Sequence, residues 1–140
     1  YLLVDDLNIV GTDGHALHIV PNEYNRAPGY YCPKTFNKIH DLDYHKPINY
    51  QRVIPELKDL HEATPGNKGT TPLDGKAEHF VTLDSDRGDG KCSHINLKYF
   101  KTAALGDYQA FISEMQMHPV VIRNDFGRAV IMPIKVNKEG

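Results

Sequence analysis

The stretch that most constrains the fold lies near the C-terminus, at residues 130–136. Its sequence is Val-Ile-Met-Pro-Ile-Lys-Val, so apolar residues stand on both sides of Pro133. A continuous apolar pattern is typical of a strand covered on both faces, but proline has no N–H to give to a neighbouring strand. The pattern therefore predicts an edge strand, or the end of one, with Met132, Pro133 and Ile134 beside an open surface. Such an edge is suited to binding a partner peptide; the alternative is a last strand of the core.

Length and composition indicate an ordinary globular protein. The chain has 140 residues, of which 40% are hydrophobic and 24% charged, enough for a single core or for two small half-domains that share one. No apolar run approaches the roughly 20 residues that cross a bilayer, and the start lacks a signal-peptide pattern. We therefore expect a cytoplasmic protein without a membrane segment. Because the first residue is Tyr1, we also expect the chain to begin inside a larger gene product, or after further segments.

Charge and cysteine content narrow the classes of partner. With a formal net charge of −2, the surface as a whole does not attract a polyanion. Nucleic acid would therefore bind only at a local basic face. The two cysteines, Cys32 and Cys92, are too few for a disulfide scaffold. We interpret them as small buried thiols in a reducing compartment, with a disulfide between them as the less favoured alternative.

Hydrophobic alternation and turn residues predict strands along most of the chain. The first twenty residues are predicted to form a three-stranded antiparallel meander, with turns at Asp5-Asp6 and Gly11-Thr12-Asp13-Gly14. Residues 64–76 are rich in Pro, Gly, Thr and Asn, and we expect a mobile loop there. Further extended segments are predicted at residues 30–32, 51–55, 77–83, 91–95, 108–115, 120–123 and 128–136.

Two helices are predicted, one in each half of the chain. Pro33 suits the first turn of a helix over 34–42, and Asn96 suits the N-cap of a helix over 97–105. Each helix follows a short strand and carries two lysines away from its apolar stripe. This repeat predicts an α+β fold with a curved antiparallel sheet and two helices on one face. The predicted organisation is one domain over 1–140, with halves at about 1–55 and 77–140 joined by the polar loop at 64–76.

The residues carry little sign of catalysis. The eight histidines are scattered, without a His-Glu-x-x-His or a cysteine partner at zinc-finger spacing. Asp84, Asp86 and Asp89 resemble a calcium loop, but the spacing is wrong and the closing glutamate is missing. No serine or cysteine stands in a recognisable nucleophile motif. We therefore predict a protein that is not an enzyme and has neither metal nor cofactor; the alternative is a small metal- or acid/base-dependent enzyme using clustered His and Asp.

Five segments, taken in order, resemble the bacterial sliding clamp, the β subunit of DNA polymerase III. The first is similar to the clamp's Ala-Thr-Asp-Gly-His-Arg-Leu signature, the second to its Tyr-Arg-Arg-Val-Leu-Pro segment, and the third to its Phe-Asn-Val-Ser-Tyr helix start. The last two resemble its closing strands and Val-Met-Pro-Met ending. In this chain the five read Gly11-Thr12-Asp13-Gly14-His15-Ala16-Leu17, Tyr50-Gln51-Arg52-Val53-Ile54-Pro55, Ile95-Asn96-Leu97-Lys98-Tyr99, Pro119-Val120-Val121-Ile122-Arg123 and Val130-Ile131-Met132-Pro133.

The chain also departs from that family. A clamp subunit has three domains, whereas this chain has room for about one, and Ala16 stands where the family usually has arginine. The resemblance covers about half of the chain. It therefore implies a reduced clamp-like protein, with bacterial and viral origins both open, which tethers replication or repair proteins to DNA and supports processivity. An adaptor that keeps only the peptide pocket is a further alternative.

The resemblance implies two binding surfaces and an assembly. A hydrophobic pocket would take peptides of polymerases or repair factors, and basic helices would meet the phosphates of double-stranded DNA without reading its sequence. Because one such domain is too small to encircle DNA, a homo-oligomer is expected. The implied peptide-binding residues are Thr12, Gly14, His15, Leu17, Pro55, Val130, Met132, Pro133 and Ile134, and the implied DNA-binding residues are Lys34, Lys38, Lys98 and Lys101.

Overall fold

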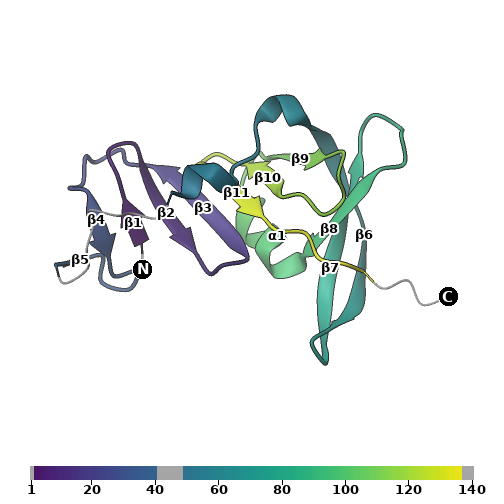
Figure 1. Ribbon diagram of the computed structural model, residues 1–140, viewed down its shortest axis with the longest axis horizontal. Helices are drawn as coiled ribbons and strands as arrows, with labels where there is room; N and C mark the ends of the chain where they lie inside the picture. The colour runs from purple at the N-terminus through teal and green to yellow at the C-terminus, as the bar shows by residue number, and fades with distance from the viewer. Residues whose placement is uncertain (1, 41–48, 137–140) are drawn as a thin grey trace.

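One antiparallel sheet dominates the computed structural model, which describes residues 2–40 and 49–136. Its 11 strands follow the order β5-β4-β1-β2-β3-β11-β10-β9-β6-β7-β8. Figure 1 shows the N-terminal strands at one end of the molecule and the long β6–β7 hairpin at the other. The strands are β1 (Leu2–Val4), β2 (Asn8–Thr12), β3 (Ala16–Pro21), β4 (Gly29–Tyr31), β5 (Lys38–Ile39), β6 (Leu60–Leu73), β7 (Lys76–Ser85), β8 (Cys92–Asn96), β9 (Gln109–Ser113), β10 (Val120–Arg123) and β11 (Arg128–Ile131).

The predicted N-terminal meander is confirmed. β1 pairs with β2 and β2 with β3, both antiparallel, and β4 pairs with the other edge of β1. The turn between β1 and β2 is held by the Asp5 carboxylate, which accepts hydrogen bonds from the backbone N–H groups of Leu7 and Asn8 at 2.9 and 2.6 Å. An aspartate in this position is a common way to close a tight turn.

The C-terminal strand joins the two ends of the sheet. β11 lies between β3 and β10, with Val130 opposite Leu17 on one side and opposite Val121 on the other. Its residues are correspondingly inaccessible: Val130 is 4% exposed and Ile131 is fully buried. The sheet is therefore continuous across both predicted halves of the chain, while the division into halves stays a prediction.

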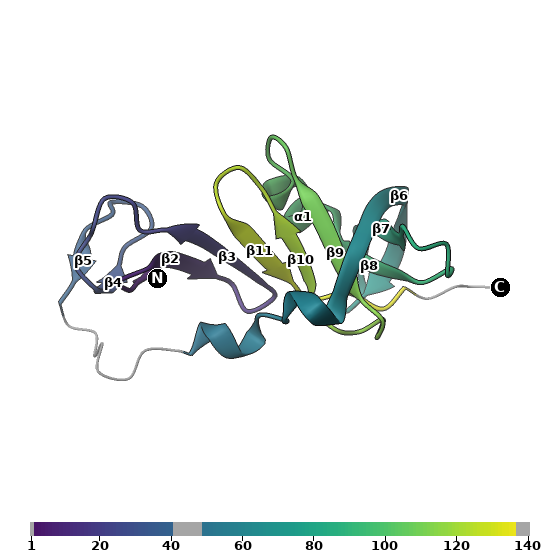
Figure 2. The same cartoon turned by 90° about the horizontal axis from the view of Figure 1, so that it is seen from above.

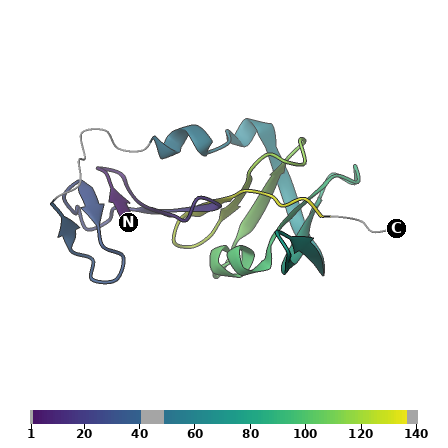
Figure 3. The ribbon, with the colours of Figure 1, turned by 60° about the horizontal axis from the view of Figure 1, so that its bottom comes forward.

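Each face of the sheet has its own core and its own cover. On one face, Ile112, Ile122 and Ile131 pack in a cluster covered by α1 (Leu97–Ala103). On the other face, Leu17, Val121 and Val130 form a second cluster that includes Tyr50 and Ile54 from the segment of the short 3-10 helices. These are η1 (Tyr50–Val53) and η2 (Leu57–Asp59). Figures 2 and 3 show α1 and the 3-10 helices on opposite sides of the sheet.

The predicted fold class is wrong. The described residues form a sheet-dominated fold with α1 as their single α-helix, not an α+β clamp-like domain with two helices on one face. Of the two predicted helices, the one over 97–105 exists but ends at Ala103. Its predicted cap is confirmed, because the Asn96 side chain accepts hydrogen bonds from the N–H groups of Lys98 and Tyr99.

The helix predicted over 34–42 is absent from its described part, residues 34–40. Here the chain turns back on itself: the N–H of Phe36 donates to the carbonyl of Cys32 at 2.8 Å, and the N–H of Cys32 donates to the carbonyl of Asn37 at 3.0 Å. Phe36 has a φ of +58°, a left-handed conformation that a right-handed helix cannot contain. The segment is therefore the turn between β4 and β5, and Leu42 lies outside the described residues.

The mobile loop predicted over 64–76 is also wrong. These residues belong to the hairpin of β6 and β7, which pair from Ala63 opposite Ser85 to Leu73 opposite Lys76. The two residues at its tip, Asp74 and Gly75, have φ angles of +50° and +77°. Positive φ at both central positions is the signature of a two-residue turn that matches the twist of paired strands, and Asp-Gly is a favoured sequence for it.

The edge strand predicted over 128–136 is only partly present. β11 ends at Ile131, and it is a central strand. Beyond it the chain leaves the sheet, as Pro133 requires, since proline cannot donate to a further ladder bond. One more hydrogen bond follows the strand, from the N–H of Met132 to the carbonyl of His15 at 3.0 Å.

Candidate peptide-binding pocket

A small apolar pocket lies on the sheet face that η1 covers. Its volume is about 220 Å³, and three separate parts of the chain build it: the turn between β2 and β3, the start of η1 and the end of β11. The residues that line it are Thr12, Gly14, His15, Ala16, Leu17, Asn49, Tyr50, Val53, Val130 and Met132.

The turn over residues 12–16, here called the pocket turn, is built around Asp13. One carboxylate oxygen of Asp13 accepts hydrogen bonds from the N–H groups of His15 and Ala16 at 2.9 and 3.0 Å. Its other oxygen accepts the hydroxyl of Tyr99, which reaches it from α1. Although partial burial acts in the opposite direction, these hydrogen bonds hold the pKa of the Asp13 carboxyl below its usual value. The ionised aspartate therefore fixes the shape of the turn.

The opposite wall of the pocket comes from η1. Tyr50 is 5% exposed, and its hydroxyl donates to the Asp5 carboxylate at 2.5 Å while accepting from the Asn8 side chain at 3.1 Å. Burial and the bond to Asp5 raise the pKa of the Tyr50 hydroxyl. Three residues on, Val53 is 52% exposed at the mouth of the pocket. The wall thus has a fixed inner part and an accessible outer one.

Met132 borders the pocket from the end of β11. It is 46% exposed, although its N–H is held by the carbonyl of His15. The side chain is therefore accessible while its backbone is fixed. A methionine in such a position adapts to ligands of different shape because its thioether chain is unbranched and flexible.

The structure brings together six of the residues implied for peptide binding: Thr12, Gly14, His15, Leu17, Val130 and Met132. The other three lie elsewhere. Pro55 lines a separate hollow of about 510 Å³ near Phe126. Pro133 is buried, and Ile134 donates its N–H to the carbonyl of His94 at 2.8 Å, so the chain has turned towards β8.

Sequence reasoning missed the contribution of Tyr50 and Val53. Both lie in the segment that resembles the clamp's Tyr-Arg-Arg-Val-Leu-Pro, so the signal was present. The segment was expected to be extended with its proline in the pocket, whereas η1 turns the first tyrosine inwards. Within this segment, the aromatic first residue, Tyr50, is the one that lines the pocket, and the proline, Pro55, is not.

The lysines implied for DNA binding lie in two separate places along the sheet. Lys98 and Lys101 are on α1 and border a hollow of about 550 Å³ between α1 and β7. Lys34 and Lys38 belong to the β4–β5 turn region at the far edge of the sheet. In the strand order, β4, β1, β2 and β3 separate β5 from β11, which α1 contacts, and neighbouring strands lie about 4.8 Å apart. The two pairs are therefore distinct patches.

Within residues 2–40 and 49–136, no group of three or more His, Cys, Asp or Glu side chains is arranged to hold a metal ion. Cys32 and Cys92 are both free and partly exposed, so their predicted burial is incomplete. None of the described helices has the length and hydropathy to cross a membrane.

No family model, curated protein or solved structure matches the chain. The resemblance to the sliding clamp therefore stays a prediction, and the pocket must be judged on its own geometry.

Proposed function

We propose that this chain is a non-catalytic binding module that tethers a partner protein through a short linear peptide. The observation that carries the proposal is the apolar pocket assembled by the pocket turn, η1 and the end of β11. The walls of the pocket are fixed by hydrogen bonds that the Asp13 carboxylate accepts and that the Tyr50 hydroxyl and the Met132 N–H donate, while Val53 and Met132 stay accessible at its rim. A preformed recess with an apolar, adaptable rim suits a peptide side chain.

The size of the pocket limits what it can bind. About 220 Å³ holds one large apolar side chain rather than a drug-sized molecule. Burying one such anchor contributes roughly 1.5–3 kcal/mol, and ordering a free peptide offsets part of the gain. We therefore expect an affinity no tighter than the micromolar range, that is, a binding free energy no more favourable than about −8 kcal/mol.

The class of partner is taken from the sequence resemblance to the sliding clamp. By that resemblance, the pocket binds peptides of polymerases or repair factors, and the chain forms a homo-oligomer that contacts double-stranded DNA. In this structure the α1 patch, Lys98 and Lys101, is the part of the implied DNA surface that stands on a helix. A cytoplasmic location is inferred from the two free thiols, Cys32 and Cys92.

A peptide titration tests the pocket. A fluorescently labelled peptide with a Leu-Phe anchor is added to the full chain, and binding is followed by anisotropy. The variant Met132→Ala should weaken binding about tenfold, because it removes the flexible part of the rim. Met117→Ala is the matched control, since Met117 is 51% exposed and does not line the pocket. Absence of binding to the wild type, or equal losses in both variants, would show that the pocket is not the peptide site.

A further inference from the structure

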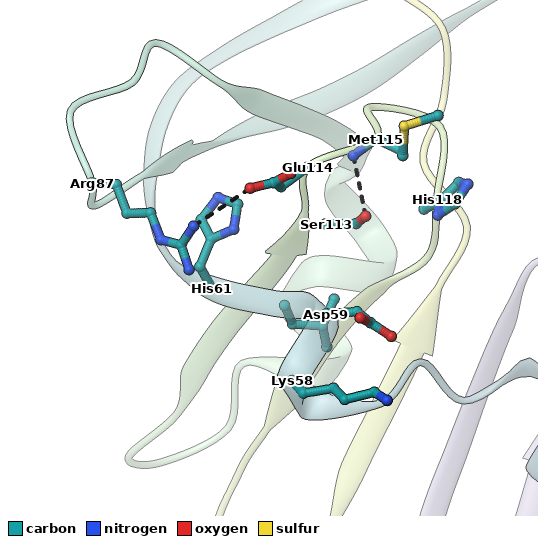
Figure 4. Close-up of a pocket in the computed structure, with 9 residues that line it drawn as sticks. Lys58, Asp59, His61, Arg87, Ser113, Glu114, Met115 and His118 are labelled. Atoms are coloured by element: carbon teal, nitrogen blue, oxygen red, sulfur yellow. Dashed lines mark hydrogen bonds and ion pairs between the residues drawn. The ribbon is translucent and has the colours of Figure 1, made fainter.

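A second hollow lies at one end of the sheet, where three loops meet. It has a volume of about 450 Å³ and is separate from the peptide pocket. Figure 4 shows its residues, which come from η2 and the start of β6, from the turn between β7 and β8, and from the segment that follows β9. They are Lys58, Asp59, Leu60, His61, Arg87, Ser113, Glu114, Met115 and His118.

One buried side chain of this hollow has an unused hydrogen-bonding atom. His61 is only 6% exposed, and among the described residues its Nε2 is the single buried side-chain nitrogen or oxygen without a hydrogen-bond partner. Leaving a buried polar atom unpaired costs about 1–3 kcal/mol. The fold therefore keeps an imidazole at an energetically costly position on β6, opposite Ile112 of β9. A ligand oxygen at the inner end of the hollow would take up this hydrogen bond.

The cations around His61 are held only loosely. The Arg87 guanidinium lies 3.6 Å from the Glu114 carboxylate, and the Lys91 ammonium lies 4.0 Å from the other oxygen of the same carboxylate. The Arg87 and Glu114 side chains are 56% and 62% exposed, and exposed pairs of this kind contribute at most about 1 kcal/mol. Figure 4 shows the Arg87 side chain extending towards His61 and Glu114. An incoming anion can therefore replace Glu114 on Arg87 at little cost.

We propose that this hollow binds the phosphate group of a small molecule. Arg87 and His61 reach the same part of it from two separate segments of the chain, while His118 lines its far side, and a tetrahedral oxyanion offers oxygens in several directions at once. A planar carboxylate would already be satisfied by the fork of one arginine. Glu114 then acts as the internal competitor that occupies Arg87 when no phosphate is bound.

The charges of the lining also argue against a cation as the ligand. Among the lining residues the two carboxylates, Asp59 and Glu114, are matched in number by Lys58 and Arg87, while Lys58 also pairs with Glu56 and Asp89 interacts with the charge of His61 from outside the lining. Within the described residues the histidines and carboxylates do not come together as a metal-binding group. The unused Nε2 of His61 becomes a donor when it carries the proton, and the neighbouring arginine can only donate. A buried donor without an acceptor, next to an arginine whose carboxylate partner is exposed, is what a phosphate group recognises.

The experiment uses inorganic phosphate and the full chain at constant pH and ionic strength. The imidazole C–H signals of His61 and His118 are followed by NMR as phosphate is added, with acetate as the comparison anion. We expect the His61 signal to shift and saturate with phosphate, and to stay in place with acetate. The affinity should fall about tenfold in Arg87→Gln, because a charge-assisted hydrogen bond is removed.

Glu114→Gln gives the sharper test, because it should increase the affinity by about threefold through removal of the competing carboxylate. Both substituted positions are more than half exposed, so the fold should be retained. The control is Arg52→Gln, an exposed arginine on η1 that does not line the hollow. The proposal is overturned if phosphate causes no saturable shift, if acetate binds as well as phosphate, or if Glu114→Gln binds no more tightly than wild type.

Discussion

Asp13 links the pocket turn to the opposite side of the sheet. It accepts two backbone N–H groups of the turn and the hydroxyl of Tyr99, which stands on α1. The bond raises the pKa of Tyr99 to about 12, with the Asp13 hydrogen bond as the largest cause. A single side chain thus connects the peptide pocket on one face with the helix on the other.

The Tyr99–Asp13 bond should give stability a defined pH range. The pKa of Asp13 is lowered from 3.8, so its contribution is present above that value and is lost as the pH falls through the lower, folded-state pKa. The pKa of Tyr99 is raised from 10.0 to about 12, so its contribution is present below 10.0 and is lost as the pH rises towards 12. At neutral pH, Tyr99→Phe should lower the free energy of unfolding by about 1 kcal/mol.

Urea unfolding at a series of pH values measures the difference between wild type and Tyr99→Phe. The difference should be largest at neutral pH and should shrink towards both extremes. A difference that does not change with pH would mean that the hydroxyl is stabilised by packing and not by the ionised aspartate.

Gly127, in the turn between β10 and β11, is required by the closeness of β3. A Cβ placed on Gly127 would lie 2.1 Å from the backbone carbonyl oxygen of Ile19, and backbone cannot move aside. Gly127→Ala should therefore cost about 3 kcal/mol of unfolding free energy. At Gly11 the nearest atom to such a Cβ is the Leu2 side chain, at 3.2 Å, so Gly11→Ala should change stability by less than about 1 kcal/mol. Equal effects in urea unfolding would contradict the assigned contact.

Among the elements, those with local signals were predictable. The N-terminal meander follows from alternation and Asp-Gly turns, and α1 from its Asn96 cap. The helix over 34–42 failed because three apolar residues at helical spacing could not reveal the left-handed backbone of Phe36, which packs on the Tyr31 ring with centroids 5.4 Å apart. The loop over 64–76 failed because composition outweighed the Asp74-Gly75 turn signal.

For the candidate site, the sequence predicted the local turn but not the contacts between distant parts of the chain. The turn at Thr12, Asp13 and Gly14 was predicted from its own residues, and its hydrogen bonds confirm that turn, whereas its place in a pocket was implied only by the family resemblance. The wall formed by Tyr50 depends on a contact with Asp5 and Asn8, more than forty positions away in the chain. No local pattern contains such a contact. The same is true of the hollow around His61, which needs three loops to converge.

The separation of the lysine patches gives a prediction at the level of elements. If α1 meets DNA, changing Lys98 and Lys101 to Ala should reduce the slope of log affinity against log salt by about 0.9 for each phosphate that is no longer neutralised. Changing Lys34 and Lys38, at the far edge, should leave the slope unchanged. Fluorescence titrations with a short duplex at several salt concentrations measure both. Identical slopes for the two double variants would mean that α1 is merely solvated.

For the whole molecule, the main question is assembly. A single sheet with a pocket on one face does not surround DNA, so encircling it requires several copies. We expect a solution mass that is a multiple of the monomer mass at micromolar concentration, measured by sedimentation equilibrium. A monomer at all concentrations would leave the peptide-binding adaptor as the remaining interpretation.

The open sheet also has a long outer margin, in the part of β6 beyond its pairing with β9. Two prolines, Pro65 and Pro72, stand in that stretch, each without an N–H. They are an odd number of positions apart, which would place them on opposite edges of a regular strand, but the irregularity between Pro65 and Lys68 adds one residue and returns both to the same edge. A second chain that tried to extend the sheet there would find gaps in its hydrogen-bond ladder. The two prolines thus work against the addition of a further strand, and so against fibre growth, at this margin.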